Sequence, residues 1–64
     1  MIGNRIKEIR KQKKITQKQL SDAIGIKDRS MITRYEQGAV EIRSGLLPKI
    51  ADALNVPIAK LFEQ

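Results

Sequence analysis

Hydrophobic residues recur along this chain at the three- and four-residue spacing of amphipathic helices. In the first segment Ile2, Ile6 and Ile9 form one apolar stripe among charged neighbours, which predicts a helix over residues 3–13. No stretch alternates between apolar and polar residues as a half-buried strand would. The pattern therefore indicates an all-α fold.

A second helix is marked by its end signals as well as by its apolar positions. Thr16 is followed three residues later by Gln19, which is the spacing of a capping box. The helix is predicted over residues 17–24, and Gly25 suits the left-handed position that ends a helix.

A third helix is predicted over residues 29–37, capped by Asp28 and closed by Gly38. Ile32 and Tyr35 give it only a thin apolar stripe. One side of this helix is therefore expected to pack in the core while the other side faces solvent.

The last third of the chain predicts two more helices. Ser44 can cap the first and Asn55 can end it, while Pro57 suits the start of the second. Their apolar residues are Leu46, Leu47, Ile50, Ala51 and Leu54, then Ile58, Leu61 and Phe62. The apolar residues from Val56 onward either cap the core or form a contact between two copies. Five short helices joined by short connections predict one all-α domain over residues 1–64.

Composition narrows the function more than the fold. The chain has 64 residues, 41% of them hydrophobic, and contains no Cys and no His. It therefore lacks disulfides, thiolate and imidazole metal ligands and the usual general base at neutral pH. Its seven carboxylates form no close pair and its four glycines no phosphate-binding loop. We expect no enzyme, no cofactor, no metal and no small-molecule substrate, and the lack of Cys favours the cytoplasm.

The formal net charge of +6 is concentrated at one end. Residues 1–14 carry six basic residues and one acid, residues 15–34 four and two, and residues 35–64 three and four. A basic surplus of this kind attracts polyanions. No apolar run is long enough for a membrane span or a signal peptide, so no membrane partner is expected.

Two helices joined by a short turn at Gly25 form the arrangement by which DNA-binding proteins place one helix in the major groove. The same pairing occurs in many small helical bundles. Spacing alone therefore leaves both DNA binding and a plain helical scaffold open.

Five short sequence motifs distinguish between these alternatives. They are Ile6-Lys-Glu-Ile-Arg10, Ile15-Thr-Gln-Lys-Gln-Leu20, Ile24-Gly-Ile26, Ile32-Thr-Arg-Tyr-Glu36-Gln-Gly38 and Ile50-Ala-Asp-Ala-Leu54-Asn-Val56. Taken in order, they resemble the Cro/repressor-type helix-turn-helix family, the lambda-repressor-like domains, over nearly the whole chain. The resemblance implies a five-helix DNA-binding domain in which helices two and three form the helix-turn-helix.

The resemblance also implies a function. It suggests a sequence-specific transcriptional regulator, a repressor, that binds double-stranded DNA as a homodimer with helix three in the major groove. Gln17 would contact phosphate and brace helix three, and Arg29 and Arg34 would read guanine through paired hydrogen bonds. Met31 either packs against the core or touches a thymine methyl group. The implied DNA-binding residues are Thr16, Gln17, Lys27, Arg29, Ser30, Met31, Thr33, Arg34 and Gln37.

Three details qualify the resemblance. Gly25 and Glu36 are eleven positions apart, one more than is usual in the family, so each base-contact assignment can shift by one residue. Ser21 stands where the family prefers alanine, and its hydroxyl needs a partner. In the family, the pair equivalent to Arg10 and Glu36 forms a partly buried salt bridge.

The alternative function is a protein-interaction module of the same fold, such as an antitoxin.

Overall fold

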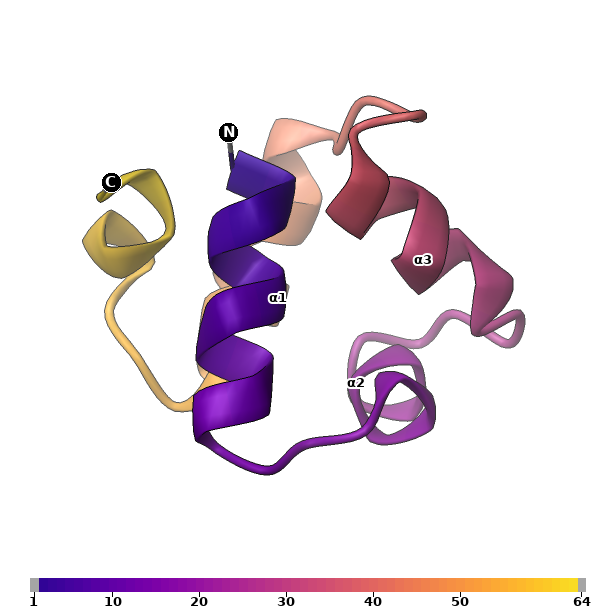
Figure 1. Cartoon of the computed structure of the whole chain (residues 1–64), viewed down its shortest axis with the longest axis horizontal. Coiled ribbons are helices and arrows are strands. Elements are labelled where there is room, and N and C mark those ends of the chain that lie inside the picture. Colours follow the sequence, from indigo (N-terminus) through magenta and orange to yellow (C-terminus); the bar gives the residue numbers. More distant parts are fainter. Residues whose placement is uncertain (1, 64) are drawn as a thin grey trace.

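The computed structural model describes residues 2–63, which contain helices and no strand. Figure 1 shows the α-helices packed around a common centre. The elements are α1 (Ile2–Gln12), α2 (Gln17–Ala23), α3 (Ser30–Gln37), the 3-10 helix η1 (Ser44–Leu46), α4 (Leu47–Leu54) and the 3-10 helix η2 (Ile58–Phe62). The predicted all-α class is confirmed.

The described residues form four α-helices, not the five that were predicted. The last segment instead forms η2, in which Lys60 N–H donates to the carbonyl of Pro57 at 2.9 Å. A five-residue segment that starts after an extended proline is too short to establish regular α-helical hydrogen bonding. The predicted helix that Ser44 was to cap begins as η1 and becomes α-helical only at Leu47.

All four α-helices end in the same way, with a residue in the left-handed conformation. Gly25, Gly38 and Asn55 have φ of 80°, 76° and 59° as predicted, and Lys14, which was not predicted, has 58°. In each case the next residue's N–H bonds to the carbonyl five positions earlier, as Ile26 does to Ser21 at 2.9 Å. This arrangement satisfies carbonyls that the helix end would otherwise leave free.

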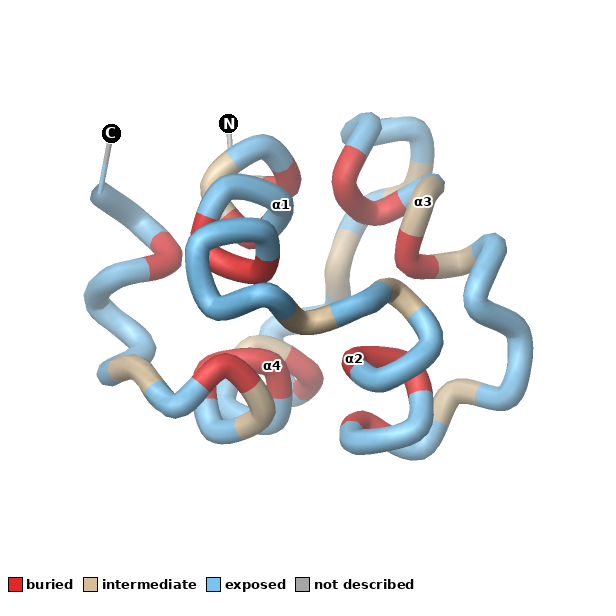
Figure 2. The backbone as a smooth tube through the Cα atoms, turned by 60° about the horizontal axis from the view of Figure 1, so that its bottom comes forward, coloured by how far each residue is buried: buried red, intermediate tan, exposed pale blue. Residues whose placement is uncertain are grey.

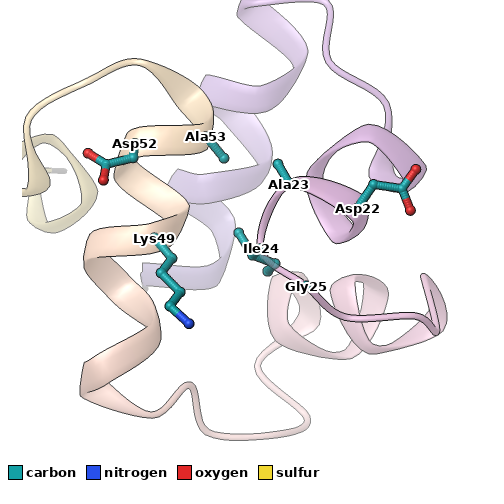
Figure 3. Close-up of a pocket in the computed structure, with 7 residues that line it drawn as sticks. All are labelled: Asp22, Ala23, Ile24, Gly25, Lys49, Asp52 and Ala53. Atoms are coloured by element: carbon teal, nitrogen blue, oxygen red, sulfur yellow. The ribbon is translucent and has the colours of Figure 1, made fainter.

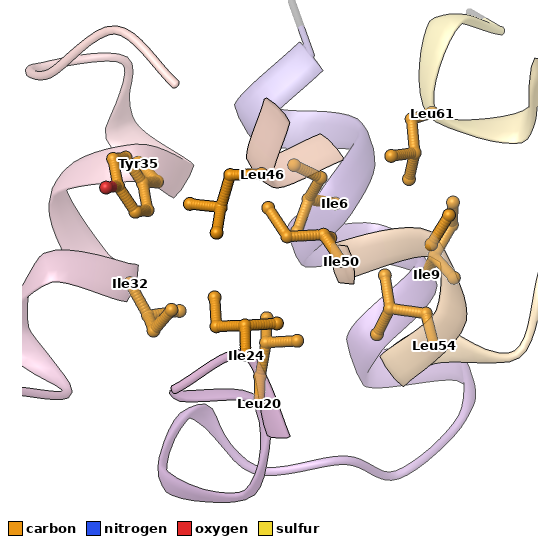
Figure 4. Close-up of a cluster of buried hydrophobic side chains, with 11 residues drawn as sticks. Ile6, Ile9, Leu20, Ile24, Ile32, Tyr35, Leu46, Ile50, Leu54 and Leu61 are labelled. Atoms are coloured by element: carbon orange, nitrogen blue, oxygen red, sulfur yellow. The ribbon is translucent and has the colours of Figure 1, made fainter. Parts of the chain in front are cut away.

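One hydrophobic core joins all of these helices (Figure 4). Its buried residues are Ile6, Ile9, Leu20, Ile24, Ile32, Tyr35, Leu46, Ile50, Ala51, Leu54 and Leu61. Leu61 is 0% exposed, so it caps the core. Ile58 and Phe62 remain 41% and 61% exposed, and therefore only part of the last apolar segment is used in packing.

Helix α1 lies against both α3 and η2, while α2 packs against α3 and α4. Arg5 joins η2 to α1, because its Nε donates to the carbonyl of Lys60 at 3.1 Å and its guanidinium lies 3.5 Å from the Glu63 carboxylate. Within residues 2–63, no helix has the length and apolar character needed to cross a membrane.

Candidate nucleic-acid interface

Helices α2 and α3 are joined by a connector over residues 24–29, in which Ile24 is buried in the core and residues 27–29 are exposed (Figure 2). The capping box at the start of α2 is confirmed. Thr16 Oγ1 accepts from the N–H of Gln19 at 3.0 Å, and Gln19 Oε1 accepts from the N–H of Thr16 at 2.8 Å. Buried Ser21 donates to the carbonyl of Lys18 at 2.9 Å, which supplies the partner its hydroxyl requires.

A buried ion pair fixes α3 against α1. Arg10 Nε lies 2.7 Å from Glu36 Oε2, a second guanidinium nitrogen lies 3.3 Å from Oε1, and both side chains are buried. Arg10 also donates to the carbonyl of Ile15 at 2.9 Å and so holds the turn between α1 and α2. The predicted structural role of this pair is confirmed. Loss of either partner would leave a buried charge without compensation.

Gln17, the first residue of α2, forms hydrogen bonds both to this ion pair and to Thr33 in the middle of α3. Its Nε2 donates to Glu36 Oε1 at 3.1 Å, and its Oε1 accepts from the Thr33 hydroxyl at 3.2 Å. We call Arg10, Glu36, Gln17 and Thr33 the polar brace. The predicted bracing role of Gln17 is confirmed, whereas its contact with phosphate stays a prediction.

Several polar side chains of α3 and of its N-cap residue Arg29 reach solvent beside the polar brace. Arg29, Ser30, Arg34 and Gln37 are exposed, whereas Met31 and Thr33 are half-buried. The Arg34 guanidinium lies 3.8 Å from the Met31 sulfur, so these two residues occupy one face of the helix. Lys27 is exposed in the connector before α3.

The structure brings three of the predicted residues together around a shallow open groove. Thr16 and Gln17 from the start of α2 face Arg29 from the start of α3, with Arg10 and Lys18 also lining the groove. The free N–H groups at the start of a helix and an arginine are both suited to bind phosphate. Gln37 lies apart from this groove, at the other end of α3.

Ser30 has a contact that sequence reasoning did not predict. Its hydroxyl donates to Asp28 Oδ1 at 2.7 Å, and its backbone N–H donates to the same oxygen at 3.0 Å. Asp28 was predicted as the N-cap, but α3 begins at Ser30 and its N-cap is Arg29, each one residue later than expected. Asp28 instead caps the first N–H of α3 from the position before Arg29. The two bonds from Ser30 and, less strongly, the nearby Arg34 charge lower the pKa of Asp28 below its ordinary value of 3.8.

A second open hollow lies between α2 and α4, away from the polar brace (Figure 3). Its charged lining residues are Asp22, Lys49 and Asp52. The side chains of Asp22 and Asp52 point away from each other toward solvent. Among residues 2–63 no three acidic, His or Cys side chains gather where they could hold a metal ion.

Comparison with known proteins agrees with this geometry. The family described as helix-turn-helix matches residues 6–61. The chain is also 34% identical over 62 residues to a protein of Sinorhizobium fredii named "Uncharacterized HTH-type transcriptional regulator y4aM". That match covers 97% of this chain and 43% of the relative's length. Through the matched residues, which contain α2, α3 and the polar brace, the chain belongs to the Cro/C1-type helix-turn-helix family.

Proposed function

We propose that the protein is a sequence-specific DNA-binding transcriptional regulator that inserts α3 into the major groove and acts as a repressor. One observation carries this proposal. The polar brace anchors the inner side of α3 while Arg29, at the N-cap of this helix, and Arg34, within it, stay exposed. A helix held in this way presents its arginines to DNA in a fixed orientation, which sequence readout requires. The family membership and the relative's name support the same function.

The exposed residues divide into two roles. Arg34 and Arg29 would each donate two hydrogen bonds to guanine O6 and N7, worth roughly 1–3 kcal/mol of discrimination per pair. The start of α2 at Thr16 and Gln17, together with Lys27, would bind the phosphates on either side. Ser30, Met31, Thr33 and Gln37 complete the proposed contact set, and Met31, whose sulfur lies beside the Arg34 guanidinium, would touch a thymine methyl.

We further propose that the regulator binds as a homodimer through the exposed end of η2. Phe62 borders an apolar groove of about 380 Å³ that is lined by Ile2, Tyr35, Val40, Ile42 and Leu47, among others. A second copy is the proposed occupant, because one surface then supplies both the exposed ring and the groove that receives it, as a twofold interface requires. Each copy would read one half-site, and the half-sites would be about one helical turn apart.

The test of readout compares Arg34→Ala with Lys13→Ala. A random duplex library first supplies the preferred sequence, and anisotropy titrations then give Kd for that duplex and for a scrambled one. We expect Arg34→Ala to lower the ratio between the two affinities about tenfold or more. Lys13→Ala should weaken binding to both duplexes by the same factor. If both variants were impaired equally on both duplexes, α3 would not be the reading helix.

The test of the dimer uses Phe62→Asp, because Phe62 is exposed and its replacement leaves the core intact. Sedimentation with the selected duplex should show two wild-type chains per palindrome and one chain for the variant. Leu61 is unsuitable for this test, since a charge at a fully buried position would unfold the domain. Two bound chains for Phe62→Asp would rule out this interface.

A further inference from the structure

Asp28 is an unusual residue for a surface that should meet DNA. Four acidic residues, Glu8, Asp22, Glu36 and Glu63, have a cation within 4.0 Å. Asp28, like Glu41 and Asp52, has no such ion pair within residues 2–63, and Lys27 and Arg29 flank it in the sequence while Arg34 lies in α3, the helix that follows it. Its negative charge is therefore exposed among the cations of the proposed interface.

The Asp28 carboxylate is also held in one orientation. Both bonds from Ser30 go to Oδ1, at 2.7 and 3.0 Å. The backbone carbonyl of Asp28 accepts from the N–H of Met31 at 3.1 Å, which ties the residue into the first turn of α3. Within residues 2–63 no hydrogen bond reaches Oδ2. One carboxylate oxygen is thus oriented by the protein while the other can accept a bond from outside it.

DNA offers few groups that such an oxygen can bind. Phosphates repel a carboxylate, and the major-groove edges of guanine and thymine present acceptors there. The hydrogen-bond donors in the major groove are the exocyclic amino groups, and cytosine N4 is the one that Asp and Glu usually contact. A carboxylate at the first turn of a reading helix is therefore favourable opposite an amino group and unfavourable elsewhere.

We propose that Asp28 is a specificity-determining residue whose Oδ2 accepts a hydrogen bond from the exocyclic amino group of a base, cytosine N4, in the major groove. This inference rests on the proposed function, because it requires α3 to lie in that groove. It assigns Asp28 two tasks. Asp28 would strengthen binding to sequences with cytosine at one position of each half-site. Its charge would weaken binding to every sequence that places no amino group there.

Asp28→Asn separates these tasks from helix capping. Asparagine caps a helix about as well as aspartate, so the thermal midpoint should stay near the wild-type value. The amide removes the negative charge and presents a donor where the carboxylate presented only acceptors. The matched control is Asp52→Asn, which makes the same change at an exposed residue of α4 beside the α2–α4 hollow (Figure 3).

The experiment is selection of bound duplexes from a random library with the wild type and both variants, followed by Kd measurements at one salt concentration. We expect the wild type to enrich cytosine at one position per half-site. Asp28→Asn should lose that preference alone and should bind the wild-type duplex about tenfold more weakly. Its affinity for scrambled DNA should rise a few-fold, because a repelling charge is gone. The Asp52→Asn variant should select the wild-type sequence.

The outcomes distinguish this inference from the proposed function. An identical selected sequence for Asp28→Asn and the wild type would overturn the role of Asp28 and leave DNA readout by Arg29 and Arg34 intact. Enrichment of adenine in place of cytosine would overturn the choice of base. If the wild type enriched no sequence at all, the proposed function would fail together with the inference.

Discussion

At the scale of single residues, Gly3 shows how closely α1 approaches α3. A Cβ atom at Gly3 would lie 2.9 Å from the carbonyl oxygen of Glu36 and would also clash with that of Tyr35. Both obstacles are backbone atoms, which cannot rotate away as a flexible side chain can. The approach matters for function because Glu36 belongs to the polar brace.

Gly3→Ala should therefore force α1 and α3 apart and lower the free energy of unfolding by about 1–3 kcal/mol, the usual cost of overpacking. Urea unfolding followed by circular dichroism gives this difference. Gly45→Ala is the matched control, since a Cβ at Gly45 meets no atom within 4 Å. An effect at Gly3 no larger than that at Gly45 would show that the helices can separate without cost.

A second prediction at this scale concerns the pH dependence of the Asp28 cap. The pKa of Asp28 is lowered in the folded protein by the two hydrogen bonds from Ser30. The cap therefore stabilises the fold fully above the unfolded pKa of about 3.8. This contribution is lost as the pH falls through the lower folded pKa. In urea titrations at several pH values, the stability advantage of wild type over Asp28→Ala should shrink below pH 4, and a constant advantage would exclude the cap as its source.

At the scale of elements, α1 ends at a residue poorly suited to the left-handed conformation that its last turn requires. Lys14 adopts φ of 58°, and the left-handed conformation costs an ordinary L-residue roughly 1–2 kcal/mol. Glycine avoids this cost but loses more chain entropy on folding. Lys14→Gly should on balance raise the free energy of unfolding by roughly 0.5–1 kcal/mol.

Lys14→Ala separates the backbone effect from loss of the charge, because alanine keeps the Cβ atom. We expect no stabilisation from it in the same thermal and urea unfolding measurements. Asn55→Gly should raise the free energy of unfolding less than Lys14→Gly does, since asparagine tolerates the left-handed conformation better than lysine. Equal gains from the glycine and alanine variants of Lys14 would mean that charge, not backbone strain, limits this turn.

The elements also show which features the sequence could predict. Local signals were sufficient for the capping box at Thr16, the left-handed end at Gly25 and the core positions Ile32 and Tyr35. The clash at Gly3 depends on a backbone more than thirty residues away, and no local pattern reports it. The position of η2 against α1 likewise depends on burial of Leu61 and on the distant contact from Arg5 to the Lys60 carbonyl, which no local pattern reports. The family resemblance anticipated the Arg10–Glu36 pair, whereas the bonds from Ser30 to Asp28 appeared only in the structure.

At the scale of the whole molecule, the basic charge lies on the half of the chain that contains the helix-turn-helix. Residues 1–34 carry a net charge of +7, from ten basic and three acidic residues, while residues 35–64 carry −1. Lys13 lies in the turn that leads directly into Thr16 and the groove shared with Arg29. Lys49 is exposed on α4 and lines the α2–α4 hollow. Substituting either lysine removes one positive charge, but from a different part of the molecule in each case.

This distribution predicts how binding responds to salt. A dimer that neutralises four to eight phosphates should lose affinity with a slope of about −4 to −7 in a plot of log K against log salt concentration. Lys13→Gln should make the slope shallower by about 2 per dimer, because one counterion-releasing contact is lost in each copy. Lys49→Gln should leave the slope unchanged, although the net charge falls equally. Equal slopes for both variants would mean that overall charge, and not the placement of cations beside α2 and α3, governs association with DNA.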